Sequence, residues 1–136
     1  MDFSSEFDVA YAREQWLIRE RQRFQIGEER RAAALTASKQ AIQAVLPRYS
    51  TIQRAYLFGS ITRPGIFADH SDVDVAVDDA SPEEYWAAWR DLDRATPGLQ
   101  IDFRVLADDP SFGKLVQRNG ILVYERKTIG LTSHAG

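Results

Sequence analysis

Cysteine is absent from the chain, and histidine is rare. Without cysteine there can be no disulfide and no thiolate metal site, which is compatible with a reducing cytoplasm. The two histidines, His70 and His134, are too few and too far apart in the sequence for a His-rich zinc site. The sequence therefore excludes the usual structural zinc centres.

Long apolar runs and a surplus of basic residues are also missing. No run approaches the ~18 apolar residues that a membrane helix requires, and the first residues lack the basic and apolar segments of a signal peptide. The net charge of -3 argues weakly against a dedicated nucleic-acid binder, although it does not exclude a local basic patch. We therefore expect a soluble, cytoplasmic protein that does not enter a membrane.

What is present suffices for one domain with a hydrophobic core. The 136 residues are 44% hydrophobic and 27% charged, as in ordinary globular proteins. We predict an N-terminal helical extension over residues 1–50, a core over 51–127 and a flexible tail over 128–136.

Residues 8–46 are predicted to be helical, since they are rich in Ala, Arg, Glu and Gln and hold no proline before Pro47. Gly27 is a place where this region could divide into two helices. Apolar residues recur at helical spacing, so one face of each half should be buried. They are Val9, Trp16, Leu17 and Phe24 in the first half and Leu35, Ile42, Val45 and Leu46 in the second. The charged residues 19–31 are expected to form a solvated face, with a partner-binding surface as the alternative.

The rest of the chain alternates between strand and helix patterns. The predicted strands span residues 55–58, 71–78, 100–106 and 121–124. Ser81 as N-cap, Pro82 and Glu84 as capping-box partner begin one helix, and a second runs from Asp109 to Gly120. Tyr85, Trp86, Trp89 and Leu92 give the first of these helices its apolar face. This order predicts an α/β (α+β) domain with one sheet and helices packed on it.

Asp72 and Asp74 lie two apart on a predicted strand, so their side chains project from the same face. Carboxylates held that close repel one another unless something positive compensates. Magnesium suits this role, since it is often held by one or two carboxylates plus substrate phosphates. Alone, the pattern fits the polar face of an exposed edge strand better than a metal site.

A glycine-serine turn ends the preceding strand. Gly59 lets the backbone approach a phosphate, and the Ser60 hydroxyl can bind its oxygens. Arg63 follows three residues later, where it could neutralise a triphosphate. Each feature alone is common in surface loops, so they gain weight only in combination.

Asp102 lies on a later strand with the same one-sided exposure. If that strand pairs beside the one carrying Asp72 and Asp74, three carboxylates converge. Three carboxylates on one face can hold two metal ions, as in phosphoryl-transfer sites.

The segment 59–74, followed by Asp102, resembles the minimal nucleotidyltransferases (MNT domains) of the DNA polymerase beta superfamily. Their signature is a Gly-Ser turn, a loop of about ten residues, an Asp-x-Asp strand and a third Asp on a later strand. The resemblance covers about residues 52–125. Two features depart from it: the loop before Asp72 holds eleven residues and includes Pro64, and Arg104 shares the face of Asp102. Arg104 could contact a phosphate, or pair with Asp102 and weaken a metal site.

The resemblance implies a small mixed sheet with the polymerase beta-like fold and magnesium-dependent transfer of a nucleoside monophosphate, AMP from ATP, to a hydroxyl. By analogy, Asp72 and Asp74 would hold the Mg²⁺ ion on the triphosphate, and Asp102 would join them to hold a second ion. The residues expected to contact the nucleotide are Gly59, Ser60, Arg63 and Ser71.

MNT proteins of this size are often antitoxins encoded beside a HEPN-domain RNase toxin, and some are thought to attach AMP to a toxin tyrosine. The resemblance thus implies a HEPN toxin as partner, with the N-terminal helical region as a docking surface that could also mediate oligomers. Three alternatives stay open: an antibiotic nucleotidyltransferase, a non-catalytic binding module that neutralises its partner by contact, and a generic α/β domain.

Overall fold

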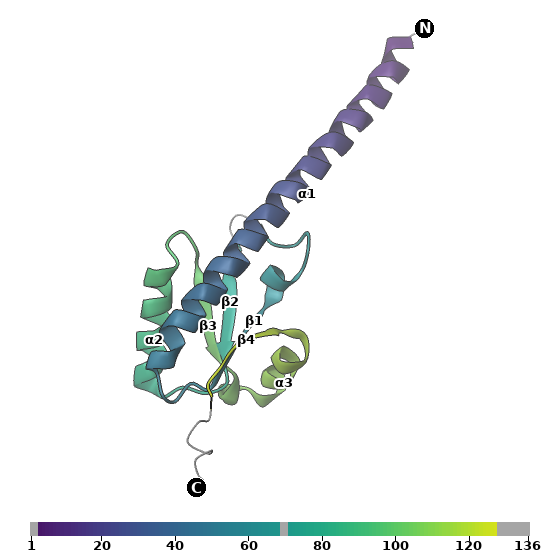
Figure 1. Ribbon diagram of the computed structural model, residues 1–136. Coiled ribbons are helices and arrows are strands. Elements are labelled where there is room, and N and C mark those ends of the chain that lie inside the picture. Colours follow the sequence, from purple (N-terminus) through teal and green to yellow (C-terminus); the bar gives the residue numbers. More distant parts are fainter. Residues whose placement is uncertain (1–2, 69–70, 128–136) are drawn as a thin grey trace.

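The computed structural model describes residues 3–68 and 71–127 (Figure 1). Its helices are α1 (Phe3–Val45), α2 (Pro82–Ala95) and α3 (Pro110–Asn119), and its strands are β1 (Arg54–Phe58), β2 (Val73–Val77), β3 (Ile101–Val105) and β4 (Ile121–Glu125). Short 3-10 turns, η1 (Leu46–Arg48), η2 (Gly59–Thr62) and η3 (Leu106–Asp108), follow α1, β1 and β3. The predicted order of helices and strands is confirmed.

The four strands form one mixed sheet in the order β3-β2-β1-β4. β1 runs antiparallel to both of its neighbours, whereas β2 and β3 are parallel. A parallel pair needs a crossover, and α2 supplies it. This confirms the predicted small mixed sheet, and it places β2 and β3 side by side along their whole length.

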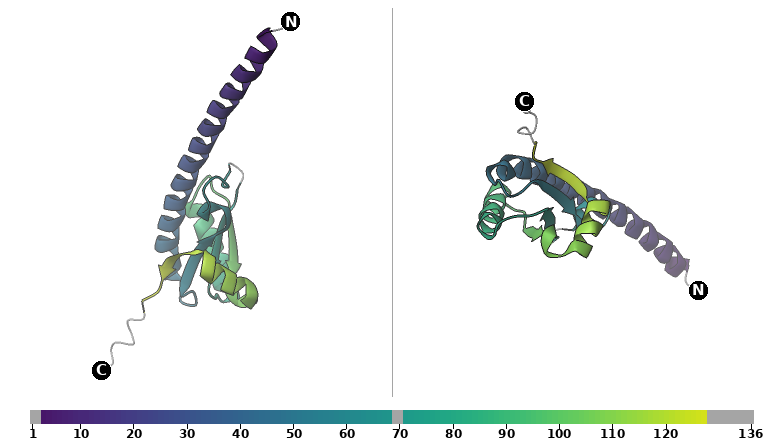
Figure 2. Two further views of the ribbon diagram at one scale, coloured as in Figure 1. Left: turned by 90° about the vertical axis from the view of Figure 1, so that its right-hand side faces the viewer. Right: turned by 90° about the horizontal axis from the view of Figure 1, so that it is seen from below.

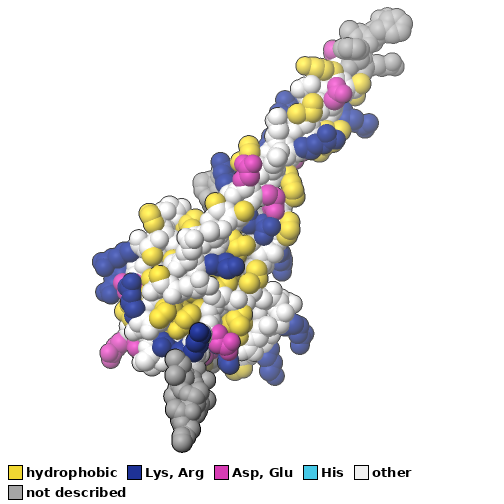
Figure 3. All heavy atoms as spheres, viewed as in Figure 1, with side chains coloured by type: hydrophobic (Ala, Val, Ile, Leu, Met, Phe, Trp, Pro, Cys, Tyr) yellow, Lys and Arg dark blue, Asp and Glu magenta, His cyan; other side chains and the backbone are white. Residues whose placement is uncertain are grey.

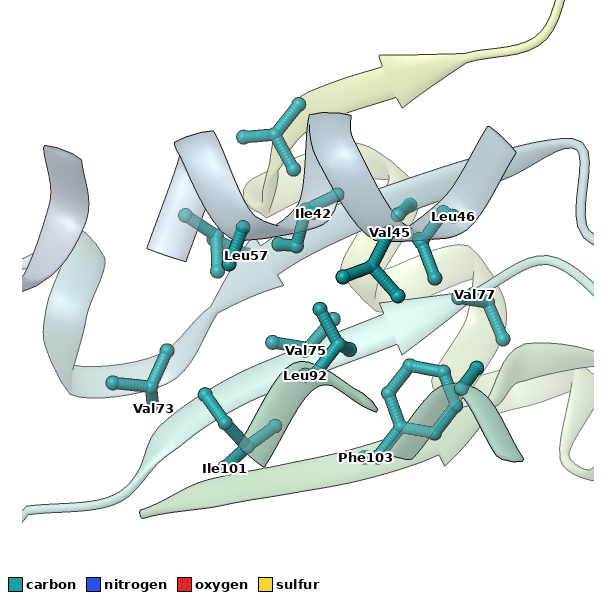
Figure 4. Close-up of a cluster of buried hydrophobic side chains, with 14 of the residues drawn as sticks. Ile42, Val45, Leu46, Leu57, Val73, Val75, Val77, Leu92, Ile101 and Phe103 are labelled. Atoms are coloured by element: carbon teal, nitrogen blue, oxygen red, sulfur yellow. The ribbon is translucent and has the colours of Figure 1, made fainter. Parts of the chain in front are cut away.

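The alternation of apolar and polar residues sorts the strands into two faces. α1 and α2 cover one face, and α3 packs on the other (Figure 2). The side chains between α1, α2 and the sheet point toward one another in the main core (Figure 4). They include Ile42, Val45, Leu46, Leu57, Val73, Val75, Val77, Leu92, Ile101 and Phe103. The last turns of α1 therefore belong to the same core as the strands, and the predicted division at residue 50 stays a prediction.

Local capping sets both predicted helix starts. Ser81 Oγ accepts a hydrogen bond from the Glu84 amide at 3.2 Å, and Asp109 Oδ1 accepts one from the Phe112 amide at 3.2 Å. The capping box, however, is incomplete. The Glu84 carboxylate accepts a hydrogen bond from the Thr51 amide at 2.8 Å instead of from Ser81, because the chain entering β1 passes beside α2.

α1 is one continuous helix, so the predicted division at Gly27 is wrong. A helix-interior glycine costs only about 1 kcal/mol relative to alanine, and strong helix formers surround this one. The predicted burial of the first apolar stretch is also wrong. Val9, Trp16, Leu17 and Phe24 are 68%, 54%, 42% and 55% exposed, because this half of α1 projects beyond the sheet (Figures 1 and 2).

Two expectations fall on residues with no structural description, namely the flexible tail after residue 127 and the two histidines. Over the ranges 3–68 and 71–127, no helix is long and apolar enough to cross a membrane.

Candidate active site

Two acidic side chains meet on the face of the sheet opposite α1 and α2. Asp74 of β2 and Asp102 of β3 are register partners on the parallel strands. Both are half-buried, and the charge of Asp102 acts on Asp74. Asp72 comes just before β2 and is exposed, although its charge still acts on Asp74.

Burial and like charges disfavour a charged carboxylate at Asp74. Burial raises its pKa from 3.8 to about 6, with further increases from the charges of Asp102 and Asp72, while the Arg104 guanidinium opposes the shift. The site thus has more negative charge than its own side chains neutralise. A bound cation would remove this penalty.

The glycine turn packs directly against Asp74. Gly59 has φ of +77°, the left-handed region that favours glycine, and a Cβ at this position would overlap with Oδ2 of Asp74. The turn is held by a 2.7 Å hydrogen bond from Thr62 Oγ1 to the Gly59 carbonyl and a 3.0 Å bond from the Arg63 amide to the Ser60 carbonyl. The motif residues Gly59, Ser60 and Asp74, distant in sequence, are therefore neighbours in space.

Two of the predicted phosphate ligands, Arg63 and Ser71, make no described contact with the acidic pair. Arg63 is exposed where the turn ends. The Ser71 hydroxyl accepts a 2.8 Å hydrogen bond from the Ala68 amide, and Ser71 lines a cavity of ≈ 620 Å³ with Phe67 and Thr96, between α1 and the end of α2. Ser71 thus faces the α1 side of the sheet, away from the carboxylate pair.

Arg104 is the cation closest to the acidic pair. Its Nε donates a 3.3 Å hydrogen bond to Oδ2 of Asp102, and its guanidinium lies 5.5 Å from the centre of the Phe112 ring. Of the two roles that the sequence suggested for Arg104, the structure shows the pairing with Asp102. Because the arginine side chain is 55% exposed, this ion pair contributes little stability and can be displaced by a ligand.

An aromatic pocket of ≈ 480 Å³ is lined in part by Arg104, the residue that pairs with Asp102. Tyr85, Trp86 and Phe112 also line it. Sequence reasoning placed Trp86 on the apolar face of its helix, but it is 65% exposed. Tyr85, Ala88 and Leu92 fit the helical spacing of the packed face, and Trp86 lies one residue off it. This offset from the packed face could have predicted from the sequence that Trp86 is a surface aromatic.

Comparison with known proteins identifies the group to which the chain belongs. Residues 40–129 match the family described as Polymerase beta, Nucleotidyltransferase. The chain belongs to this nucleotidyltransferase family. Its fold is also similar to the crystal structure of a candidate nucleotidyltransferase from Sulfolobus solfataricus, at 16% identity and a TM-score of 0.49, over 75% of this chain and 89% of that one. No curated protein matched.

Proteins with nucleotidyltransferase domains generally use nucleoside triphosphates and divalent metals. The residues of this site can be compared with those that hold such a cation. Within the described part of the chain, no three His, Cys, Asp or Glu side chains gather into a metal-binding group. The nucleotidyltransferase does bring two carboxylates together beside the Gly59 turn. Magnesium often takes one or two carboxylates and completes its shell with phosphate and water. The residues therefore fit a cation that arrives with its nucleotide.

Proposed function

We propose that this nucleotidyltransferase transfers AMP from ATP to a hydroxyl acceptor in the cytoplasm, at the site formed by Asp74, Asp102 and the Gly59 turn. One observation carries the proposal: Asp74 and Asp102 are side by side on parallel strands, with the backbone of Gly59 against Asp74. Burial, together with the neighbouring carboxylates, raises the pKa of Asp74 to about 6, so a bound cation would stabilise its charged form.

Each residue has a role that follows from its position. The missing Cβ of Gly59 leaves room for the Asp74 carboxylate against the turn, and Ser60 would offer its hydroxyl to a phosphate oxygen. Asp74 and Asp102, with Asp72 at the rim, would hold Mg²⁺, which supplies charge neutralisation to the triphosphate when bound.

The reaction then requires a positioned acceptor. The acceptor oxygen forms the new bond to the α-phosphorus, the bond to the bridging oxygen breaks, and pyrophosphate leaves. Asp102 would accept the hydroxyl proton from an acceptor held in the aromatic pocket that its partner Arg104 lines. Most of the rate gain would come from position and electrostatics.

The aromatic pocket favours a tyrosine as acceptor. Trp86 and Phe112 offer ring faces and edges for a phenol ring, and Arg104 joins the pocket wall to Asp102. We therefore propose a tyrosine of a HEPN-domain RNase toxin as the acceptor, which would make the chain an antitoxin.

Mass spectrometry of the toxin after incubation with the chain, ATP and Mg²⁺ tests this proposal. We expect mass to be added in steps of one AMP, and Asp74→Asn to abolish the addition. Trp86→Ala should slow labelling roughly tenfold at limiting toxin, a loss of about 1.4 kcal/mol in transition-state binding. It should leave the KM for ATP unchanged. The matched control is Leu115→Ala, which removes an exposed apolar side chain of α3 outside the pocket.

A non-catalytic binding module is the second candidate, because the Arg104–Asp102 pair partly occupies the acidic site. It predicts that the Asp74→Asn variant still neutralises the toxin by contact, without added mass. An unlabelled toxin alongside a correctly folded chain would remove the modification proposal.

A further inference from the structure

The projecting half of α1 carries an apolar stripe that the described part of the chain leaves largely exposed. Trp16 and Phe24 are 54% and 55% exposed. Ala34 follows Trp16 by eighteen residues, and Ile42 follows Phe24 by the same number, which is five turns at 3.6 residues per turn. Ala34 and Ile42 are buried against the sheet, where they are 4% and 1% exposed. The stripe therefore continues the core-facing side of α1 beyond the body, and hydrophobic side chains are visible along this extension (Figure 3). Apolar surface of this kind marks an interaction site.

Charged residues interrupt the stripe in a regular pattern. Along one helix face run Val9, Arg13, Trp16 with Leu17, Glu20 and Phe24. The order from the N-terminal end is apolar, basic, apolar, acidic, apolar. A stripe of this kind is complementary to itself when it is reversed.

We infer that two copies of this chain pair through α1 in antiparallel orientation, with the two-fold axis between Trp16 and Leu17. Val9 then lies opposite the partner's Phe24, Arg13 opposite the partner's Glu20, and Trp16 opposite the partner's Leu17. A two-fold arrangement repeats each contact with the copies exchanged.

A parallel pair of the same helices in register is excluded by charge. It would set Arg13 against the partner's Arg13 and Glu20 against the partner's Glu20, so like charges would repel along the seam. Glu20 already pairs with Arg23 on its own helix, but exposed pairs at this spacing contribute only a few tenths of a kcal/mol. Such a contact does not keep Glu20 from a partner's arginine.

The paired segment extends to the start of the body. Its first contacts with α1 begin at Phe24, whose ring lies against Gly65, and continue at Glu28, which accepts a 2.8 Å hydrogen bond from the Gly65 amide. Residues 9–24 span about 24 Å of helix before the body begins. The two bodies would lie at opposite ends of the paired segment.

Sedimentation equilibrium of the full chain tests the inference, which does not depend on the proposed reaction. We expect twice the monomer mass at concentrations on the order of tens of micromolar. Trp16→Glu should give a monomer, whereas Ile18→Glu, which replaces an exposed apolar side chain off the stripe, should leave the dimer intact. Circular dichroism would verify that each variant keeps its helix content. A wild-type chain that stays monomeric at these concentrations would overturn the inference.

Charge reversal distinguishes the orientation. Arg13→Glu and Glu20→Arg should each weaken the dimer at least tenfold, and the double variant should restore it, because the opposite charges meet again. A double variant no tighter than the single ones would contradict the antiparallel register.

Because the native chain has no cysteine, crosslinking gives a clean second test. The double variant Val9→Cys with Phe24→Cys should form a covalent dimer under mild oxidation, and neither single variant should. Covalent dimers from Val9→Cys alone would show a parallel pair and refute the arrangement.

Discussion

Asp74 combines partial burial with two neighbouring carboxylates. Its ordinary pKa of 3.8 rises to about 6 in the folded chain, so the folded state binds the proton more tightly than the unfolded state. The stability that Asp74 contributes is fully present below pH 3.8 and is lost as the pH rises through about 6. At neutral pH without metal, the charged side chain therefore destabilises the fold.

Asp74→Asn should raise the free energy of unfolding at pH 7.5 in EDTA by about 1–2 kcal/mol. Solvent screening makes this less than the full pKa shift implies. The gain should largely vanish near pH 4, where the native carboxyl is protonated. Urea unfolding at the two pH values measures both. Equal stability of variant and native chain at pH 7.5 would show that the charged Asp74 carboxylate does not destabilise the fold.

Arg104 would compete with a cation that binds Asp102, since its Nε lies 3.3 Å from the carboxylate. Arg104→Ala should therefore tighten Mn²⁺ binding about three- to tenfold, equivalent to about 0.7–1.4 kcal/mol. Calorimetric titration measures the affinity, with Arg118→Ala on the exposed side of α3 as the control. Weaker Mn²⁺ binding in Arg104→Ala would mean that the arginine supports the site.

At the scale of elements, the η2 turn follows β1 and packs against the side chain of Asp74. Gly59→Ala would place a Cβ on the Asp74 carboxylate and force alanine to φ of +77°. We expect a loss of at least about 2 kcal/mol in stability, together with loss of nucleotide binding. Thermal unfolding and ATP titration measure the two effects.

Gly98→Ala is the matched control for this turn. Gly98 has φ of +88°, yet nothing lies within 4 Å of the position that an alanine Cβ would take there. This variant should lose about 1 kcal/mol from strain alone and bind ATP normally. If both variants lost nucleotide binding equally, the contact between the turn and Asp74 would be irrelevant.

Elements set by local chemistry could be predicted from the sequence. The alternation around Asp74 and Asp102 indicated both strands and the face they share, and the Ser81 and Asp109 caps indicated the helix starts. Whether a face is covered depends on the rest of the fold, so the exposure of Trp16 could not be inferred from its own segment. The side to which Ser71 turns depends likewise on the Ala68 hydrogen bond.

At the scale of the whole molecule, the parallel pairing of β2 and β3 determines the candidate site. This topology sets Asp74 beside Asp102. From the sequence, the two carboxylates could be expected to meet only if their strands were neighbours in the sheet. The assignment of Asp72, Asp74 and Asp102 as metal ligands stays a prediction, because the structure brings two of them into register and leaves Asp72 exposed at the rim.

Magnesium-dependent ATP binding by the full chain tests this account most directly, because it needs no acceptor. Calorimetry should show ATP binding with Mg²⁺ and at least tenfold weaker binding in EDTA. Asp74→Asn and Asp102→Asn should each weaken it at least tenfold, while Asp93→Asn, an exposed carboxylate of α2, should not. ATP binding that is unchanged in a folded Asp74→Asn, Asp102→Asn double variant would contradict the account.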